Sequence, residues 1–152
     1  LLNNEMTDFA REYQADAPPQ ANAVRAHTRP RSSMSPTMIF DSEGRLQMVT
    51  GSPGGNSIPA YVAKSILGVM DWGLSAHEAL DHANIIARGD RIRVEVGMPG
   101  GQEIADHLKD QGYDVAEREG ENSGLHVIVV NEQGAQGAAD KRREGTVWRA
   151  LP

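Results

Sequence analysis

Cysteine is absent from the 152 residues of this chain, which excludes disulfide scaffolds, thiolate zinc sites and cysteine nucleophiles. Aromatic residues make up only 5% of it, so the core must be built mainly from aliphatic side chains. No apolar run approaches the roughly 18 residues that a membrane-spanning helix needs, and no signal peptide is visible. The five histidines show no metal-ligand spacing. We therefore predict no membrane span, no metal site and no cofactor.

A net basic surface is also lacking. Asp and Glu outnumber Lys and Arg by 21 to 15, which gives a formal charge of -6 and argues against a nucleic-acid partner. The densest basic cluster, Lys141, Arg142 and Arg143, is followed at once by Glu144. We interpret this cluster as a solvated turn rather than a binding patch.

Two hairpins are predicted beyond an irregular first stretch, residues 1–36. Short apolar runs at 38–40 and 127–130 each lead into a turn with Asp or Asn first and Gly fourth, Asp41 to Gly44 and Asn131 to Gly134. Residues 46–49 and 135–139 would form the returning strands. Because both apolar runs are nearly continuous, we expect these strands in a sheet that is covered on two faces.

Between the hairpins the hydrophobic period becomes helical. Apolar residues at spacings of three and four predict a helix from residue 58 to Met70, and the sequence from Ser75 to Glu78 is typical of a capping box. Residues 92–96 alternate as in a half-buried strand, and 102–111 form a third helix before another strand at 115. The order β-β-α-α-β-α-β-β-β predicts an α+β fold with helices packed on a largely antiparallel sheet. We expect one domain over residues 1–152.

The turn at residues 50–57 is the first candidate site. Gly54 and Gly55 lie between a buried strand and a helix start, where glycines allow close approach of a ligand and unpaired N–H groups are available. Such a turn can hold a phosphate, a carboxylate or a developing oxyanion. It is not a P-loop, because no Gly-Lys-Ser/Thr follows. A plain strand-to-helix turn is the alternative.

Two further segments could bind a polar ligand. Ser32 and Ser33, between two prolines, could both donate hydrogen bonds to one carboxylate, although the segment could equally be a hydrophilic loop. Glu5 and Asp8, three residues apart, would share one face of a helical turn. Two carboxylates on one face suit an ammonium group, and a solvent-facing turn is the alternative there.

These three segments together resemble the gamma-glutamyltranspeptidase family. Residues 1–9 read Leu-Leu-Asn-Asn-Glu-Met-Thr-Asp-Phe, and residues 29–37 read Arg-Pro-Arg-Ser-Ser-Met-Ser-Pro-Thr. Residues 50–55, Thr-Gly-Ser-Pro-Gly-Gly, match that family's motif throughout. Weaker matches lie at 93–95 and 138–143, so the resemblance covers nearly the whole chain.

The resemblance implies an N-terminal nucleophile hydrolase, made as a precursor that cleaves itself into a large and a small subunit. It implies an αββα sandwich of which this chain would be the C-terminal part of the small subunit. Glu5 and Asp8 would bind the donor's alpha-amino group, and Ser32 and Ser33 its alpha-carboxylate. The N–H groups of Gly54 and Gly55 would form the oxyanion hole. A periplasmic or secreted location is suggested by the resemblance alone.

The sequence departs from the family in ways that keep alternatives open. Residue 1 is Leu rather than the nucleophilic Thr, whose free amine acts as its own base, and the family's Arg for the alpha-carboxylate belongs to the large subunit. We expect the chain alone to be inactive and to self-associate through exposed sheet around 127–130. Within a parent enzyme that cleaves gamma-glutamyl amides, the large subunit and the gamma-glutamyl substrate would be its partners. A glutaryl or cephalosporin acylase and a non-catalytic binding or structural module are the alternatives.

Overall fold

The computed structural model describes residues 4–10 and 20–148. Contacts between the residues divide the chain into two units, Leu1–Ser33 and Met34–Pro152. The first unit contains the short 3-10 helix η1 (Glu5–Asp8) and an isolated bridge between Ala10 and Ala23. Its other described residues are irregular, as predicted. A single domain over residues 1–152 stays a prediction.

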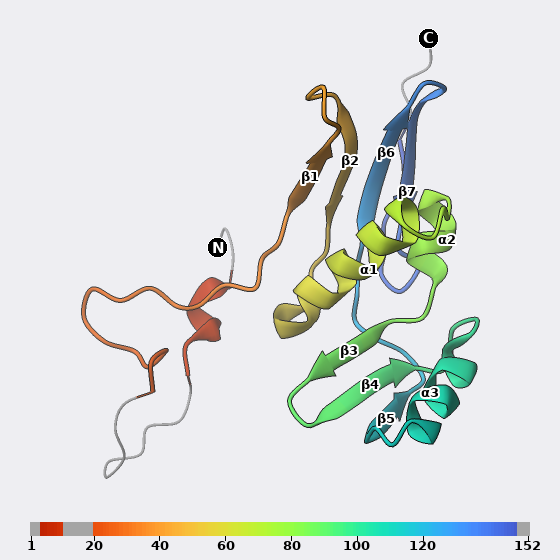
Figure 1. Cartoon of the computed structure of the whole chain (residues 1–152). Coiled ribbons are helices and arrows are strands. Elements are labelled where there is room, and N and C mark those ends of the chain that lie inside the picture. Colours follow the sequence, from red (N-terminus) through yellow and green to blue (C-terminus); the bar gives the residue numbers. More distant parts are fainter. Residues whose placement is uncertain (1–3, 11–19, 149–152) are drawn as a thin grey trace. The chain divides into compact units, whose positions relative to one another are not determined.

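A four-stranded antiparallel sheet dominates the second unit, with strand order β1-β2-β6-β7 (Figure 1). Its strands are β1 (Thr37–Phe40), β2 (Leu46–Gly51), β6 (His126–Asn131) and β7 (Gly134–Ala139). Both predicted hairpins are confirmed. Each turns at a glycine with a positive φ, 79° at Gly44 and 113° at Gly134, which a residue with a side chain adopts only with strain.

Helices α1 (Ile58–Met70) and α2 (Ala76–Asp81) cover one face of this sheet. The core joins Met48 and Val127 of the sheet to Tyr61 and Leu80 of the helices. The capping box of Ser75 and Glu78 is present as predicted.

The apolar stripe that predicted α1 is only part of the face that the helix buries, since Ile58 and Val62 are buried and Ile66 packs against the core. Tyr61, Ser65 and Gly68 are buried, whereas Met70 is 45% exposed. The close approach of α2 is the physical reason, because a Cβ on Gly68 would lie 2.8 Å from the Cβ of Ala79. The helix therefore presents its smallest side chains to its neighbour.

The opposite face of the sheet is covered only in part by the described residues of this unit, since a Cβ on Gly137 would lie 2.8 Å from Cγ1 of Val147 while other apolar side chains there are exposed. Met38, Phe40 and Ile128 are 64%, 54% and 47% exposed. Among the described residues of this unit the helices lie on one side of the sheet only, so cover on both faces stays a prediction. A sheet with helices on one face and apolar side chains on the other is the arrangement expected of half an αββα sandwich. The α+β class is confirmed.

A smaller sheet follows α2, with strand order β3-β4-β5. It consists of β3 (Ile85–Arg88), β4 (Arg91–Glu95) and β5 (Val115–Arg118), and α3 (Gly101–Asp110) connects β4 to β5 and packs on both. The sequence did not predict β3. Nor did it predict that β4 and β5 pair in parallel, which the crossover through α3 permits. None of the helices within the described ranges is long and apolar enough to cross a membrane.

Candidate active site

The turn after β2 has a backbone that only glycine accommodates without strain. Gly54 has a φ of 138° and Gly55 a φ of 56°, and the 3-10 helix η2 (Gly55–Ser57) follows at once. The N–H of Ser57 donates to the carbonyl of Gly54 (3.2 Å), while the N–H of Gly54 finds no acceptor among the described residues. A Cβ on Gly54 would lie 2.5 Å from Cε2 of Tyr61. The turn is therefore fixed against α1.

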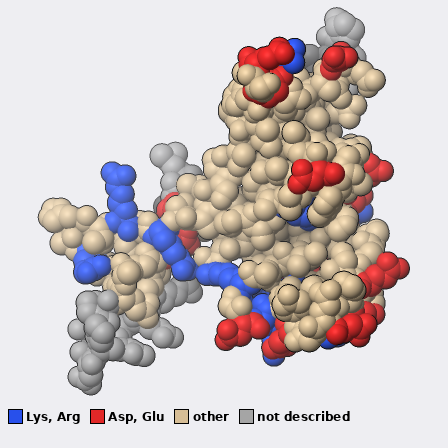
Figure 2. Space-filling model, viewed as in Figure 1, with Lys and Arg blue, Asp and Glu red and all other residues tan. Residues whose placement is uncertain are grey.

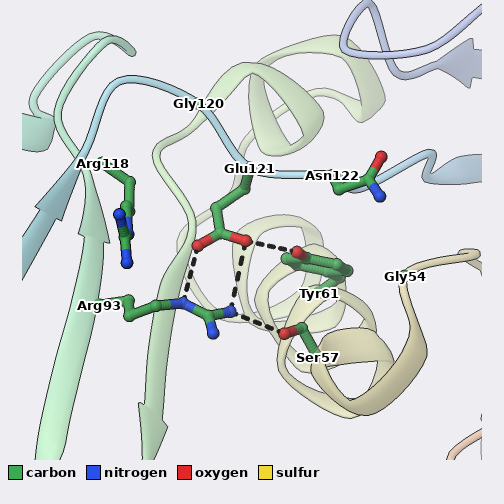
Figure 3. Close-up of a pocket in the computed structure, with 8 residues that line it drawn as sticks. All are labelled: Gly54, Ser57, Tyr61, Arg93, Arg118, Gly120, Glu121 and Asn122. Atoms are coloured by element: carbon green, nitrogen blue, oxygen red, sulfur yellow. Dashed lines mark hydrogen bonds and ion pairs between the residues drawn. The ribbon is translucent and has the colours of Figure 1, made fainter.

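A cavity of about 470 Å³ opens beside this turn (Figure 3). It lies between the start of α1, β4 and the loop that leads from β5 to β6. Its lining residues are Gly54, Ser57, Tyr61, Arg93, Arg118, Gly120, Glu121 and Asn122. The cavity thus contains two guanidinium groups and one carboxylate.

Four of these side chains form one hydrogen-bonded cluster. Tyr61 Oη donates to Glu121 Oε2 (2.7 Å), and Arg93 Nε donates to Glu121 Oε1 (3.0 Å). Arg93 Nη2 also donates to Ser57 Oγ (2.8 Å), so Ser57 begins α1 without capping it through its side chain. Burial, together with the Glu121 carboxylate, raises the pKa of Tyr61 to about 12, which keeps the phenol protonated as a donor. The cluster ties β4 and the β5–β6 loop to the turn.

The same loop supports the turn from its other side. Gly124 N–H donates to Ser52 Oγ (3.1 Å), and Arg143 Nη2 donates to the carbonyl of Asn122 (2.9 Å). A Cβ on Gly124 would lie 2.8 Å from Cγ of Pro53. The backbone of the loop at Gly124 is thus packed against the side chains of Ser52 and Pro53 in the turn.

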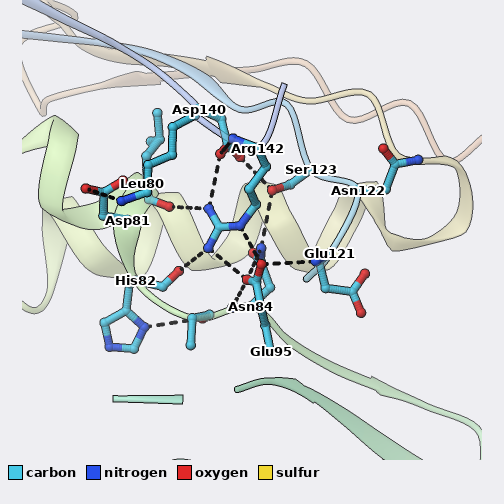
Figure 4. Close-up of polar contacts among 12 residues, drawn as sticks. Leu80, Asp81, His82, Asn84, Glu95, Glu121, Asn122, Ser123, Asp140 and Arg142 are labelled. Carbon is cyan, nitrogen blue, oxygen red and sulfur yellow. Dashed lines mark hydrogen bonds and ion pairs between the residues drawn. The ribbon is translucent and has the colours of Figure 1, made fainter. Parts of the chain in front are cut away.

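A buried polar network lies behind the loop (Figure 4). Arg142 donates to both carboxylate oxygens of Glu95 (2.7 Å each) and to Asp140 (3.1 Å), and its side chain is only 6% exposed. Glu95 also accepts from the backbone N–H groups of Asn84 and Glu121 (3.0 Å each). The interpretation of residues 141–143 as a solvated turn is therefore wrong for Arg142, because two buried carboxylates require its charge.

The first unit brings together two of the predicted donor-binding residues. Ser32 Oγ donates to Glu5 Oε1 across 3.1 Å, although 27 positions separate the two residues. Glu5 and Asp8 are the first and last residues of η1, and a 3-10 helix places residues three apart on the same side. Ser33 follows directly and is partly buried. Gly54 and Gly55 belong to the second unit.

The comparisons with known proteins now decide the family. The model of the gamma-glutamyltranspeptidase family matches residues 1–150. The chain belongs to this family.

Two curated relatives and one solved structure show the extent of the similarity. The glutathione hydrolase proenzymes of Escherichia coli and Bacillus subtilis are 34% and 30% identical over 149 residues. The match covers 93% and 95% of this chain but 25% and 24% of those proteins, so the chain spans about a quarter of their length. A gamma-glutamyltranspeptidase structure from Pseudomonas nitroreducens, the W525D mutant, matches with a TM-score of 0.80 at 28% identity, covering 100% of this chain and 82% of that one.

The sequence did not predict the residues that surround the glycine turn of this family member. Tyr61 lies three positions after Ile58, so helical spacing could have placed it on the buried face. Arg93 alternates with apolar residues in β4, which indicated only that it faces away from them. No local signal indicates Glu121, because its partners are 28 and 60 positions away.

A second buried cation, Lys64, lies beside Arg142 and provides a test of the buried polar network around Arg142. Its Nζ donates to the carbonyls of Leu80 (3.1 Å) and His82 (2.8 Å). Arg142 also donates to both carbonyls, at 2.7 and 3.1 Å, so they stay hydrogen-bonded without the lysine. Burial, reinforced by the charge of Arg142, lowers the pKa of Lys64 to about 8.

We expect Lys64→Met to raise the free energy of unfolding at pH 7 by about 1–3 kcal/mol, because it removes a buried charge without orphaning an acceptor. In the wild type, Lys64 binds more protons unfolded than folded between pH 8 and 10.5, so the wild type gains stability there as the pH rises. The advantage of the variant should therefore shrink between pH 7 and 10 in urea unfolding. A variant less stable than the wild type at pH 7 would contradict this account.

Proposed function

We propose that this chain supplies the donor-binding groups and the oxyanion hole of an enzyme that cleaves gamma-glutamyl amides. One observation carries the proposal. The structure places a carboxylate, Glu5, and a hydroxyl, Ser32, 3.1 Å apart in the first unit. A site that recognises the alpha-carbon of an amino acid needs such a pair, since ammonium and carboxylate groups are attached to that one atom.

Each donor group then has a partner of matching chemistry. Glu5 and Asp8 accept hydrogen bonds from the alpha-ammonium group, and Ser32 and Ser33 donate to the alpha-carboxylate. These neutral hydroxyls leave the carboxylate charge unbalanced. The family resemblance assigns the balancing Arg to the large subunit, and it assigns the nucleophile to a Thr outside these 152 residues.

In the reaction the Thr hydroxyl attacks the gamma-carbonyl carbon and its proton passes to the threonine's own amine. The oxygen of the tetrahedral intermediate accepts hydrogen bonds from the N–H groups of Gly54 and Gly55. Collapse expels the amine and leaves a gamma-glutamyl ester. Water or an amino acceptor then attacks the ester, which gives hydrolysis or transfer.

The experiment compares two anilides on the full-length protein. We expect gamma-glutamyl-anilide to be turned over at least about a hundredfold faster, in kcat/KM, than glutaryl-anilide, because glutarate leaves Glu5 and Asp8 without their ammonium partner. Glu5→Gln should weaken that preference, whereas Glu43→Gln, an exposed change in the β1–β2 turn, should keep it. Equal turnover of both anilides would favour the glutaryl acylase. Absence of turnover with either anilide would favour the non-catalytic module.

The partners of the chain are part of the same proposal. The match to a quarter of the length of proteins named proenzymes supports an assembly with further segments of one precursor. Self-association of the isolated chain stays a prediction. Within the run at 127–130, Val127 is buried and Ile128 is exposed. We therefore expect self-association to involve the sheet face that carries Ile128 rather than the whole run.

A further inference from the structure

The cavity beside Gly54 contains an unbalanced positive charge. Of its two guanidinium groups, that of Arg93 is paired with Glu121, the only carboxylate among the lining residues. Arg118 projects from the end of β5 beside Arg93 (Figure 3) and has no hydrogen bond or ion pair from its side chain to any described residue. A cation thus faces the cavity without a partner, in a chain whose formal charge is -6.

This charge belongs to a basic face of the second sheet. The register pairs Arg88 with Arg91 and places Arg93 between Ile86 and Ala116, so these residues and Arg118 lie on one side of the strands. A second cavity of about 510 Å³ runs along that side and shares Arg93 and Arg118 with the first. Figure 2 shows basic side chains beside acidic ones at the end of the β3–β4 hairpin, and mainly acidic ones over α3.

The neighbouring carboxylates do not neutralise Arg118. Asp114 pairs with Arg91 (2.8 Å) and Glu117 pairs with Lys109. Glu117 precedes Arg118 in β5, and the alternation of a strand directs it to the side on which α3 packs. Glu95, the cross-strand partner of Arg118, is paired with Arg142. The charge of Arg118 is therefore available to a ligand.

The position of the cavity indicates which ligand this is. One end is Gly54, where the proposed function places the gamma-carbonyl oxygen, and Arg118 lines the cavity on the far side of the Arg93–Glu121 pair (Figure 3). The group attached to the scissile nitrogen extends away from that carbonyl. A volume of about 470 Å³ accommodates an amino acid or dipeptide. A guanidinium fork matches a carboxylate in shape and charge.

We propose that this cavity is the subsite for the leaving amine and the acceptor, and that Arg118 binds their free alpha-carboxylate. Arg93 positions the wall by holding Glu121 and Ser57. The inference rests on the proposed function, since the oxyanion hole at Gly54 sets its orientation. Leaving group and acceptor share the subsite, because transfer is the reverse of acylation with a different amine.

The test uses the full-length enzyme with gamma-glutamyl-anilide as donor and two acceptors, glycylglycine and its C-terminal amide. For the wild type we expect kcat/KM for transfer to be about tenfold higher with the carboxylate than with the amide, as one charge-assisted hydrogen bond provides. Arg118→Ala should bring the ratio close to one, Arg118→Lys should keep part of it, and Arg118→Glu should invert it. Arg45→Ala, which removes an exposed arginine from the β1–β2 turn, should keep the wild-type ratio.

Thermal unfolding of each variant shows that a changed ratio is not a folding defect, since the exposed, unpaired Arg118 side chain should leave the midpoint unchanged. The subsite proposal would be overturned if the wild-type enzyme did not prefer the carboxylate acceptor over its amide. It would also be overturned if Arg118→Ala kept that preference. Failure of the wild type to release aniline from the donor would instead overturn the proposed function.

Discussion

Replacing Gly54 with alanine is expected to slow acylation by about a hundredfold or more, the usual effect of losing one oxyanion-hole donor. The new Cβ would lie 2.5 Å from the Tyr61 ring, and the φ of 138° at this position is strained for any residue with a side chain. The backbone must shift, and the N–H groups shift with it. The measurement is the single-turnover acylation rate of the full-length enzyme with gamma-glutamyl-anilide.

Gly55→Ala is the matched control. A Cβ there meets nothing within 4 Å, and a φ of 56° lies in the left-handed region that alanine enters at a cost of about 1 kcal/mol. Both N–H groups should keep their directions, so this variant should lose a little stability and keep most of its acylation rate. An unchanged rate in folded Gly54→Ala enzyme would show that the turn is not the oxyanion hole.

Replacing Arg142 with methionine should have the largest effect on stability, a loss of about 3–5 kcal/mol in the free energy of unfolding. Glu95 and Asp140, 1% and 2% exposed, would remain as buried carboxylates without their cation. Lys141→Met is the control next to it. Lys141 is exposed and paired with Asp81 across 3.1 Å, and such surface pairs contribute about 1 kcal/mol or less.

The pH dependence distinguishes charge from packing in this prediction. Hydrogen bonds from Arg142, Asn84 and Ser123 hold the pKa values of Glu95 and Asp140 below their ordinary range, despite burial. Their contribution to wild-type stability is present above the ordinary carboxyl pKa and is lost as the pH falls below it. In Arg142→Met, protonation removes the buried charge, so the deficit should shrink between pH 7 and 4. Urea unfolding at both pH values measures it, and a deficit that does not change with pH would indicate lost packing instead.

Much of the fold could be predicted because its signals are local. The turns at Gly44 and Gly134, and the capping box at Ser75, each depend on residues within four positions of one another. The helical period placed α1 and the part of its buried face that carries Ile58 and Val62, but not the part that carries Ser65 and Gly68. That part depends on the approach of α2, which a one-dimensional pattern does not contain. Strand β3 was missed although Ile85, Ile86 and Ala87 are apolar, because so short a run without alternation does not distinguish a strand from a helix.

By itself the sequence determined the α+β class, the two hairpins and the family resemblance, and it supplied the residues that we propose for donor binding and for the oxyanion hole. Each follows from contiguous motifs whose chemistry is local. The tertiary structure alone decided that Arg142 is buried and that Tyr61, Arg93 and Glu121 surround the turn at Gly54. It also decided that Arg118 faces this cavity while the cavity's one carboxylate, Glu121, is paired with Arg93. Whether a charge is solvated or buried depends on its partners, and Glu95 is 47 positions from Arg142, so only the folded chain brings the two together.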